Sequence, residues 1–158
     1  MPMRSLSPFA VMKPIRALAH RLAWKFFPPE APLLGDKDEL GLRGENLAAR
    51  FLQTRGYKIL LRRFRCRYGE IDLVCRDGDS LAFVEVKARH ADDAARPSDA
   101  VGSEKQLHLS RCALDYLARL DSPDVVARFD VVEVVWREPR PELMLIENAF
   151  PLSEPYRY

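Results

Sequence analysis

The sequence predicts an α/β fold, a mixed β-sheet flanked by helices with the element order α-β-β-β-α-β. Three observations carry this prediction: an amphipathic segment with helical spacing, three alternating segments joined by short turns, and a second helical segment that leads into a valine-rich run. These segments span residues 40–55, 57–67, 70–76, 80–89, 103–120 and 128–136. Because a strand, a helix and a strand in succession imply a right-handed parallel crossover, the sheet is expected to be mixed.

The first predicted helix runs from about Leu40 to Arg55, and Gly56 is well placed to end it. Its inward stripe consists of residues at helical spacing: Leu42, Glu45, Ala48, Ala49 and Leu52. Within that stripe Glu45 stands where an apolar residue is expected. A carboxylate on the buried side of a helix is a candidate functional group.

The second predicted helix begins at Ser103, which forms a capping-box pair with Gln106, and it runs to about residue 120. The segment 128–136 that follows is so rich in valine that both of its faces are expected to be buried. Asp130 interrupts this segment, so it is expected to have a structural hydrogen bond or a cationic partner. Residues 143–149 are a candidate for an additional edge strand.

The chain is expected to divide into a basic extension with a proline-rich linker (1–39), one globular domain (40–150) and a short tail (151–158). The first 29 residues contain no Asp or Glu, and they place apolar residues at helical spacing. Three interpretations of this segment stay open: a basic helix that contacts membrane or nucleic acid, a docking helix, and a poorly ordered extension. Met12 is an alternative start of the chain.

Composition favours a globular protein of the cytoplasm. The formal net charge of +2 is too small to identify a polyanionic partner, so a nucleic-acid surface must come from local clustering. No apolar run is long enough for a membrane span or a secretory signal. Cys66, Cys75 and Cys112 are not spaced as CxxC, so neither a zinc ribbon nor a redox dithiol is indicated. Reduced thiols and a cytoplasmic location are therefore expected.

The second predicted strand carries acidic residues on one face. Side chains two apart on a strand share a face, so Glu70 is expected to project with Asp72. Ile71 and Leu73 are expected to face the core together. Glu70 has two interpretations, an outer ligand of a site or the partner of a surface arginine.

The third predicted strand brings Glu85 and Lys87 to one face. The short turn before it makes the second and third strands antiparallel neighbours, so Asp72 is expected beside Glu85, and the helix residue Glu45 could complete the cluster. Converging carboxylates repel one another, whereas a bound Mg²⁺ or Mn²⁺ removes that conflict. Asp72, Glu85 and Glu45 are therefore candidate metal ligands, and Lys87 is a candidate for orienting water or offsetting transition-state charge.

Several blocks together resemble one family, and they come in its order and approximate spacing: Gly41–Glu45, Gly56-Tyr57, Gly69–Val74 (GEIDLV), Phe83–Arg89 (FVEVKAR), Lys105-Gln106 and Arg128–Val132 (RFDVV). The chain resembles the small bacterial YraN-type proteins, a branch of the PD-(D/E)XK nuclease superfamily with a restriction-endonuclease-like fold. The resemblance covers about residues 41–136 and implies that Asp72, Glu85 and Lys87 take the superfamily's Asp and Glu-x-Lys roles. It places Glu45 where archaeal Holliday-junction resolvases have a helix carboxylate. The chain departs from the family at Arg63, which replaces an asparagine.

Basic residues accompany the candidate site and are predicted to contact nucleic-acid phosphates: Arg63, Arg65, Arg67, Arg89 and Lys105. The first three are expected to share one strand face. Lys105 lies near a helix N-terminus, where backbone N–H groups also favour phosphate. The alternative is solvent-facing charge that protects an edge strand from aggregation.

Three hypotheses of function remain from the sequence. The leading one is a Mg²⁺-dependent endonuclease, with DNA favoured over RNA and branched or repair intermediates as candidate substrates. The second is a nucleic-acid-binding module without catalysis. The third is a scaffold recruited to a membrane or partner by the N-terminal segment. A homodimer is compatible with the first, because resolvase-like relatives cut two strands as dimers.

Overall fold

The chain was analysed as a computed structural model, which describes residues 36–92, 101–120, 125–137 and 140–153, with side chains from Glu39 onward. The predicted N-terminal helix and residues 154–158 of the predicted tail lie outside the described residues. The elements are α2 (Asp36–Thr54), β1 (Lys58–Cys66), β2 (Gly69–Asp77), β3 (Ser80–His90), α3 (Ser103–Ala118), β4 (Val126–Trp136) and β5 (Glu142–Phe150). Their order confirms the predicted α-β-β-β-α-β succession and adds the edge strand that the sequence left open.

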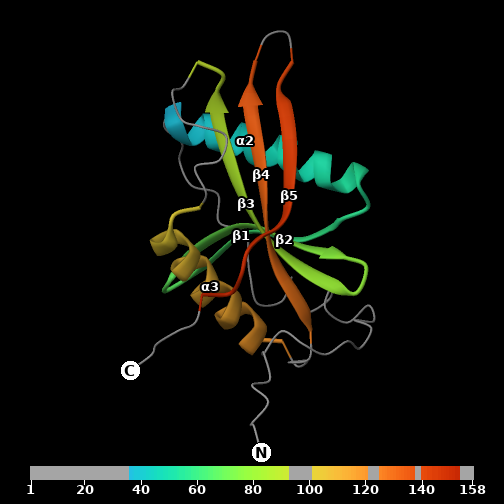
Figure 1. The fold of residues 1–158 in the computed structure, drawn as a ribbon, viewed down its shortest axis with the longest axis vertical. Helices are drawn as coiled ribbons and strands as arrows, with labels where there is room; N and C mark the ends of the chain where they lie inside the picture. The colour runs from blue at the N-terminus through green and yellow to red at the C-terminus, as the bar shows by residue number, and fades with distance from the viewer. Residues whose placement is uncertain (1–35, 93–100, 121–124, 138–139, 154–158) are drawn as a thin grey trace, which may run out of the picture.

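The five strands form one mixed sheet in the order β1-β2-β3-β4-β5. The pairs β1–β2, β2–β3 and β4–β5 are antiparallel, whereas β3 and β4 are parallel and joined through α3. The predicted meander and the parallel crossover are therefore both confirmed. The β1–β2 hairpin is strongly rotated relative to the three strands that follow (Figure 1).

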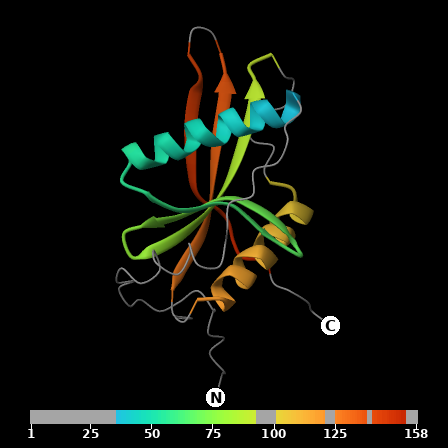
Figure 2. The ribbon, with the colours of Figure 1, turned by 180° about the vertical axis from the view of Figure 1, so that it is seen from behind.

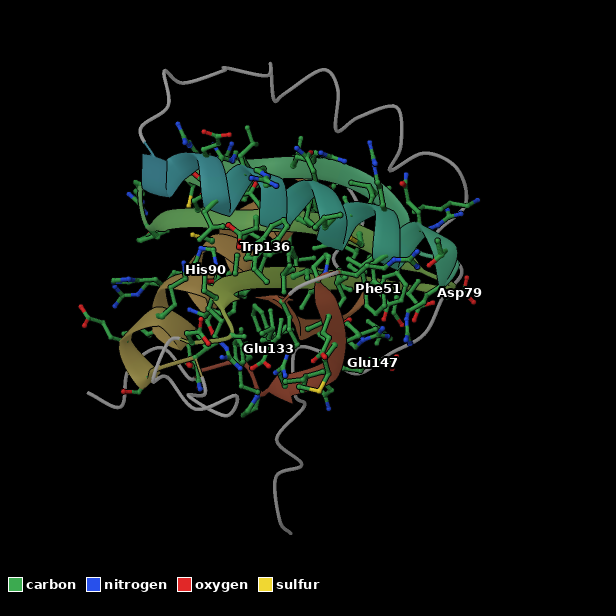
Figure 3. The ribbon with its side chains drawn as sticks, turned by 90° about the horizontal axis from the view of Figure 1, so that it is seen from above. Phe51, Asp79, His90, Glu133, Trp136 and Glu147 are labelled. Carbon is green, nitrogen blue, oxygen red and sulfur yellow. The ribbon has the colours of Figure 1, made fainter. Side chains whose placement is uncertain are left out.

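The two helices cover opposite faces of the sheet. Helix α2 lies across one face of the sheet (Figure 2), and α3 packs on the other, mainly against β2 and β1. Seen along the sheet, Trp136 lies on the α2 side and Glu133 on the opposite side (Figure 3). Two apolar cores result, one built around Leu52 of α2 and one around Tyr116 of α3. Alternating apolar residues on the strands supply both cores, as period-two patterning requires.

Halfway along the β1–β2 hairpin, the two faces of the strands exchange, so that side chains two residues apart pack in different cores. Leu73 packs in the α2-side core, but Ile71, two residues earlier, packs in the α3-side core with its pairing partner Phe64. The prediction that Ile71 and Leu73 share a face is therefore wrong. The cause is a local change of backbone conformation, because Arg63 beside this point has a φ of 52°. Asp72 lies at the place where the hairpin turns.

The helix boundaries differ slightly from those expected. Helix α2 begins at Asp36, so it includes residues that were assigned to the linker. The residue at the N-cap of α3 is Gly102 rather than Ser103, and no side-chain cap hydrogen bond is present. The capping-box prediction is wrong because the Gln106 side chain donates to the carbonyl of Val101 at 2.6 Å instead. The last turn of α2 is followed by Gly56 with a φ of 91°, which confirms its predicted role in ending the helix.

Asp130 is fully buried in β4, and a polar network satisfies it, as the sequence predicts. The Nε of Arg128 donates to its two carboxylate oxygens at 2.9 and 3.2 Å, and the backbone N–H of Asn148 donates at 2.9 Å. The hydroxyl of Tyr57 donates to Asp130 at 3.3 Å and accepts from Arg128 at 2.7 Å. Burial, followed by the charge of Asp130, raises the pKa of Tyr57 to about 12. This network ties the start of β1 to β4 and β5, away from the candidate site.

Gly44 is the point of close approach between α2 and β3. A Cβ placed on Gly44 would lie 2.7 Å from the Cβ of Ala88, a separation that real side chains do not tolerate. Because the next residue is Glu45, this contact sets how near the helix carboxylate can come to the sheet. The same helix contains Gly41, where an added Cβ meets nothing within 4 Å.

We expect Gly44→Ala to lower the free energy of unfolding by about 1 kcal/mol. The gain in helix propensity is about 1 kcal/mol, whereas the overpacking of a rigid core costs about 1–3 kcal/mol. Urea unfolding of Gly44→Ala, of Ala88→Gly and of the double variant measures the coupling between the two positions. Gly41→Ala is the matched control and is expected to be neutral or stabilising. Equal effects of the two glycine substitutions would contradict the close approach.

Candidate active site

The candidate site lies where the sheet forks between β2 and β3. The pairing of these strands ends at Leu73 and Val84, and the next residues on the two strands are Asp72 and Glu85. Beyond this point β2 remains paired with β1, while β3 remains paired with β4. The fork therefore places one carboxylate on each of its two branches. This arrangement confirms the predicted proximity of the two strands at these residues.

Asp72 is half-buried within the fork. Its Oδ2 accepts a hydrogen bond from the backbone N–H of Val86 at 2.7 Å, beyond the last paired position of β3. Burial, together with the charges of Glu85 and Glu45, raises the pKa of Asp72 to about 7, while the Val86 N–H and Lys105 act in the opposite direction. Asp72 is thus an acidic group whose negative charge is opposed by its own surroundings.

Glu85 is a buried carboxylate held between two ammonium groups. Only 5% of the residue is exposed. The Nζ of Lys87 lies 3.4 Å from its Oε1, and the Nζ of Lys105 lies 3.2 Å from its Oε2. Lys87 comes from the same strand, whereas Lys105 comes from the first turn of α3. The structure thus brings the predicted Glu-x-Lys pair together and adds a second lysine.

Glu45 approaches the region from the other face of the sheet. It is buried in α2, and Arg63 forms a bidentate ion pair with it: Nε donates to Oε2 at 2.9 Å and Nη2 donates to Oε1 at 2.8 Å. The Nε of Arg63 also lies 3.8 Å from Glu70, and Arg65 forms an ion pair with the same carboxylate. The Glu45 carboxylate raises the pKa of Arg63, which keeps the guanidinium charged. Glu45 therefore already has a cationic partner from this chain, and Glu70 takes the ion-pair role that the sequence offered as one of its two interpretations.

The donor set suits a hard divalent cation held by two carboxylates. Across the described residues, no three Asp, Glu, His or Cys side chains are grouped so as to hold a metal ion by themselves. Mg²⁺ and Mn²⁺ nonetheless favour oxygen ligands and are commonly bound by one or two carboxylates together with water and substrate phosphate. The Oε2 of Glu85 is buried and lacks a hydrogen-bond partner, and the charge of Asp72 is opposed by Glu85. The two carboxylates of Asp72 and Glu85 repel each other, and a bound divalent cation would remove that repulsion.

The predicted basic residues do not form a single row. Arg63 and Arg65 meet at Glu70, but Arg67 lies in the turn after β1 and contacts the ring of Tyr68. The prediction that all three share one strand face is therefore wrong, because the strand ends at Cys66. Arg89 follows Lys87 on the same face of β3, and Lys105 contacts the site directly.

Two contacts of the site were missed by the sequence analysis. The pairing of Glu45 with Arg63 depends on a positive φ in β1, and no residue type in this stretch indicates such a backbone. The contact of Lys105 with Glu85 depends on where α3 begins relative to the fork. One signal was present, since Lys105 was already placed at the start of that helix.

Cys66, Cys75 and Cys112 are free, and the latter two are buried. Within the described parts of the chain, no helix has both the length and the apolar character needed to cross a membrane.

Comparison with known proteins identifies the family. A sequence model described as "Uncharacterised protein family UPF0102" matches residues 44–134, which contain all four candidate site residues. A UPF0102 protein of Geobacter metallireducens is 46% identical over 114 residues, which cover 72% of this chain and 93% of that protein. A UPF0102 protein of Syntrophus aciditrophicus is 47% identical over 115 residues, covering 72% and 89% respectively. The UPF0102 protein STH1475 of Symbiobacterium thermophilum is 49% identical over 115 residues, covering 70% and 95%. The chain therefore belongs to the family UPF0102.

Proposed function

We propose that this protein is a metal-dependent endonuclease that hydrolyses DNA phosphodiester bonds. The observation that carries the proposal is the fork of the sheet, where Asp72 and Glu85 stand on separate branches and Lys87 lies beside Glu85. The resemblance of the GEIDL and FVEVK blocks to PD-(D/E)XK nucleases supports the same assignment. Mg²⁺ or Mn²⁺ is the proposed cofactor.

Each residue of the site has a role in this proposal. Asp72 and Glu85 would hold the cation, and Glu45 would contribute either to a second cation or to a bound water. A cation so held supplies polarisation of the phosphodiester and a water of lowered pKa. Lys87, whose side chain is about two-fifths exposed, can reach an incoming phosphate from its position beside Glu85. Its ammonium would orient the attacking water or offset the charge that develops on the phosphoryl oxygens.

The substrate would be held by charge rather than by base reading. Arg65 and Arg89 lie on the two branches of the fork, where phosphate contacts would flank the site. The sequence contains no motif typical of a groove-reading helix or of an aromatic stacking platform. We therefore propose weak sequence specificity, with branched or repair intermediates as candidate substrates and a homodimer as the form that would cut two strands.

The test is cleavage of a labelled panel of single-stranded, duplex, flap and four-way-junction DNA, and of RNA, with Mg²⁺ or Mn²⁺. Wild type is expected to cleave at least one DNA member, and Glu85→Ala is expected to cleave none while remaining folded by circular dichroism. Cleavage of RNA alone would change the substrate. Salt-sensitive binding with no cleavage by folded wild type would replace the endonuclease with a binding module.

The pair of Arg63 and Glu45 gives a prediction about metal-linked stability. Asn adopts positive φ more readily than Arg, so Arg63→Asn relieves about 1 kcal/mol of backbone strain. The same substitution leaves the buried Glu45 without its cation, which is expected to cost more, about 2–3 kcal/mol. We therefore expect a lower melting temperature in EDTA and a larger recovery with Mn²⁺ than wild type shows, because Glu45 becomes available as a ligand.

Thermal unfolding in EDTA and in Mn²⁺ checks this prediction. Arg65→Asn is the matched control, because Arg65 lies on the same strand, is about half exposed and pairs with Glu70 instead. It should show the metal response of wild type. An equal Mn²⁺ shift in wild type and Arg63→Asn would show that Arg63 does not keep Mn²⁺ from Glu45.

A further inference from the structure

Lys105, at the start of α3, contacts a carboxylate that is buried in the sheet. It lies in the first turn of α3, and its ammonium lies 3.2 Å from Oε2 of Glu85, across the sheet from α2. Its side chain is 42% exposed, so it reaches from solvent onto a carboxylate that is almost fully buried. The contact joins an element outside the sheet to one of the proposed metal ligands.

The carboxylate oxygen that Lys105 contacts is also the one left incompletely satisfied. Within the described part of the chain, Oε2 of Glu85 is buried and accepts no hydrogen bond, whereas Lys87 lies against the other oxygen, Oε1. A lysine ammonium near a carboxylate without hydrogen-bond geometry is a weakly held counter-ion that a stronger cation can displace. Oε2 is thus the oxygen most open to such an exchange.

Lys105, once displaced, would remain beside a second anion-attracting feature. The first turn of α3 has Gly102 at its N-cap and no side-chain cap hydrogen bond, and the Gln106 side chain donates to the carbonyl of Val101. Backbone N–H groups at an uncapped helix start attract phosphate, and an ammonium in the same turn strengthens that attraction. The helix start and Oε2 of Glu85 are connected through one side chain.

We propose that Lys105 is an exchangeable counter-ion that couples the two binding events of the site: a divalent cation displaces it from Glu85, and it then contacts a DNA phosphate at the start of α3. This inference rests on the proposed function and assigns Lys105 as a residue that contacts the DNA at that site. It predicts opposite effects of one substitution. Removing the ammonium should raise the affinity for the divalent cation, because a competitor is lost. It should lower the affinity for DNA, because a phosphate contact is lost.

The test compares wild type with Lys105→Met, using Mn²⁺ alone in isothermal titration calorimetry on protein stripped of metal. We expect Lys105→Met to bind Mn²⁺ about two- to fivefold more tightly, the range of a partly exposed ion pair. Fluorescence anisotropy of a labelled DNA duplex in Ca²⁺ should show about tenfold weaker binding by the variant. The strengthening of duplex binding by Ca²⁺ over EDTA should also be smaller in the variant than in wild type.

Two further variants control the comparison. Lys105→Arg keeps the charge and is expected to restore both affinities toward those of wild type. Lys58 is an exposed lysine at the first position of β1, where it is paired with Arg76 of β2 and lies away from Asp72. Lys58→Met should therefore leave the Mn²⁺ affinity unchanged. Circular dichroism verifies that each variant is folded.

The outcomes separate this inference from the proposed function. If wild type binds Mn²⁺ and Lys105→Met binds it equally or more weakly, the exchange is wrong and Lys105 only supports Glu85, while the metal site stands. If Mn²⁺ binds more tightly but duplex affinity is unchanged, the phosphate half of the proposal is wrong. If wild type binds no Mn²⁺, the proposed metal site and the exchange both fail.

Discussion

Lys87→Met should reduce DNA cleavage on the order of a hundred- to a thousandfold while leaving the protein folded and able to bind Mn²⁺. Lys87 lies beside Glu85 with about two-fifths of its side chain exposed, so its ammonium could act on a bound phosphate. Methionine keeps the length and most of the packing of the side chain. The loss should therefore appear in the rate of cleavage at saturating DNA, with a smaller change in DNA affinity.

The measurement is single-turnover cleavage with enzyme in excess, together with Mn²⁺ calorimetry on the same preparation. Lys58→Met is the matched control, because it makes the same change at an exposed site on the far side of the hairpin. Full cleavage by Lys87→Met would remove the lysine from the mechanism. Loss of Mn²⁺ binding together with cleavage would show that Lys87 acts through Glu85 rather than on the substrate.

Asp130→Ala should lower the free energy of unfolding by about 3–5 kcal/mol, a large part of the stability of a domain of this size. The substitution removes one of the two carboxylates that bind the half-buried Arg128, leaving only Asp77, and it removes the acceptor of the Asn148 N–H. Tyr57 also loses the group to which it donates. Because the network joins β1, β4 and β5, its loss affects the sheet as a whole.

Urea unfolding followed by circular dichroism measures this effect. Asp130→Asn keeps the volume and part of the hydrogen bonding, so it should cost less than the alanine variant. Asp115→Ala removes an aspartate from the helical ion pair with Arg119 and should cost less than 1 kcal/mol, as such pairs do. Equal costs for Asp130→Ala and Asp115→Ala would mean that the buried network contributes no more than a surface pair.

The fold could be predicted because each element has a strong local signal. The alternation of β3 and the valine-rich β4 specify strands, and the short turns at Gly69 and Gly78 specify antiparallel neighbours. The capping-box prediction failed for α3 because the Gln106 amide, which in a capping box accepts from a backbone N–H, instead donates to the carbonyl of Val101, and this contact depends on tertiary position. Local patterns thus determine the type of an element better than the contacts at its ends.

The candidate site was predicted in part: one of the two assumptions behind it, strand alternation, held, and the other, a regular hairpin, did not. Strand alternation correctly placed Glu85 with Lys87. It placed Asp72 beside Glu85 by assuming a regular hairpin, whereas the structure brings them together where the hairpin turns over and the sheet forks. A positive φ at Arg63 accompanies this turn, and arginine does not indicate one. Backbone conformations that oppose the preference of the residue cannot be inferred from residue type.

Glu45 shows the same limit for charged partners. Helical periodicity located it as a carboxylate on a buried stripe, and the structure confirms its burial. Its partner Arg63 is 18 residues away and was predicted to contact nucleic acid instead. Ion pairs between elements depend on how a helix crosses a sheet, which here is set by the contact of Gly44 with Ala88.

The most direct test of the central claim is a crystal structure of the protein soaked with Mn²⁺, with data collected to reveal anomalous scattering from the ion. The account predicts an anomalous peak that contacts carboxylate oxygens of both Asp72 and Glu85, at the fork between β2 and β3, with Lys105 withdrawn from Glu85. A fully occupied peak elsewhere on the molecule, or a fork that stays free of Mn²⁺ at millimolar concentration while Lys105 remains on Glu85, would contradict it.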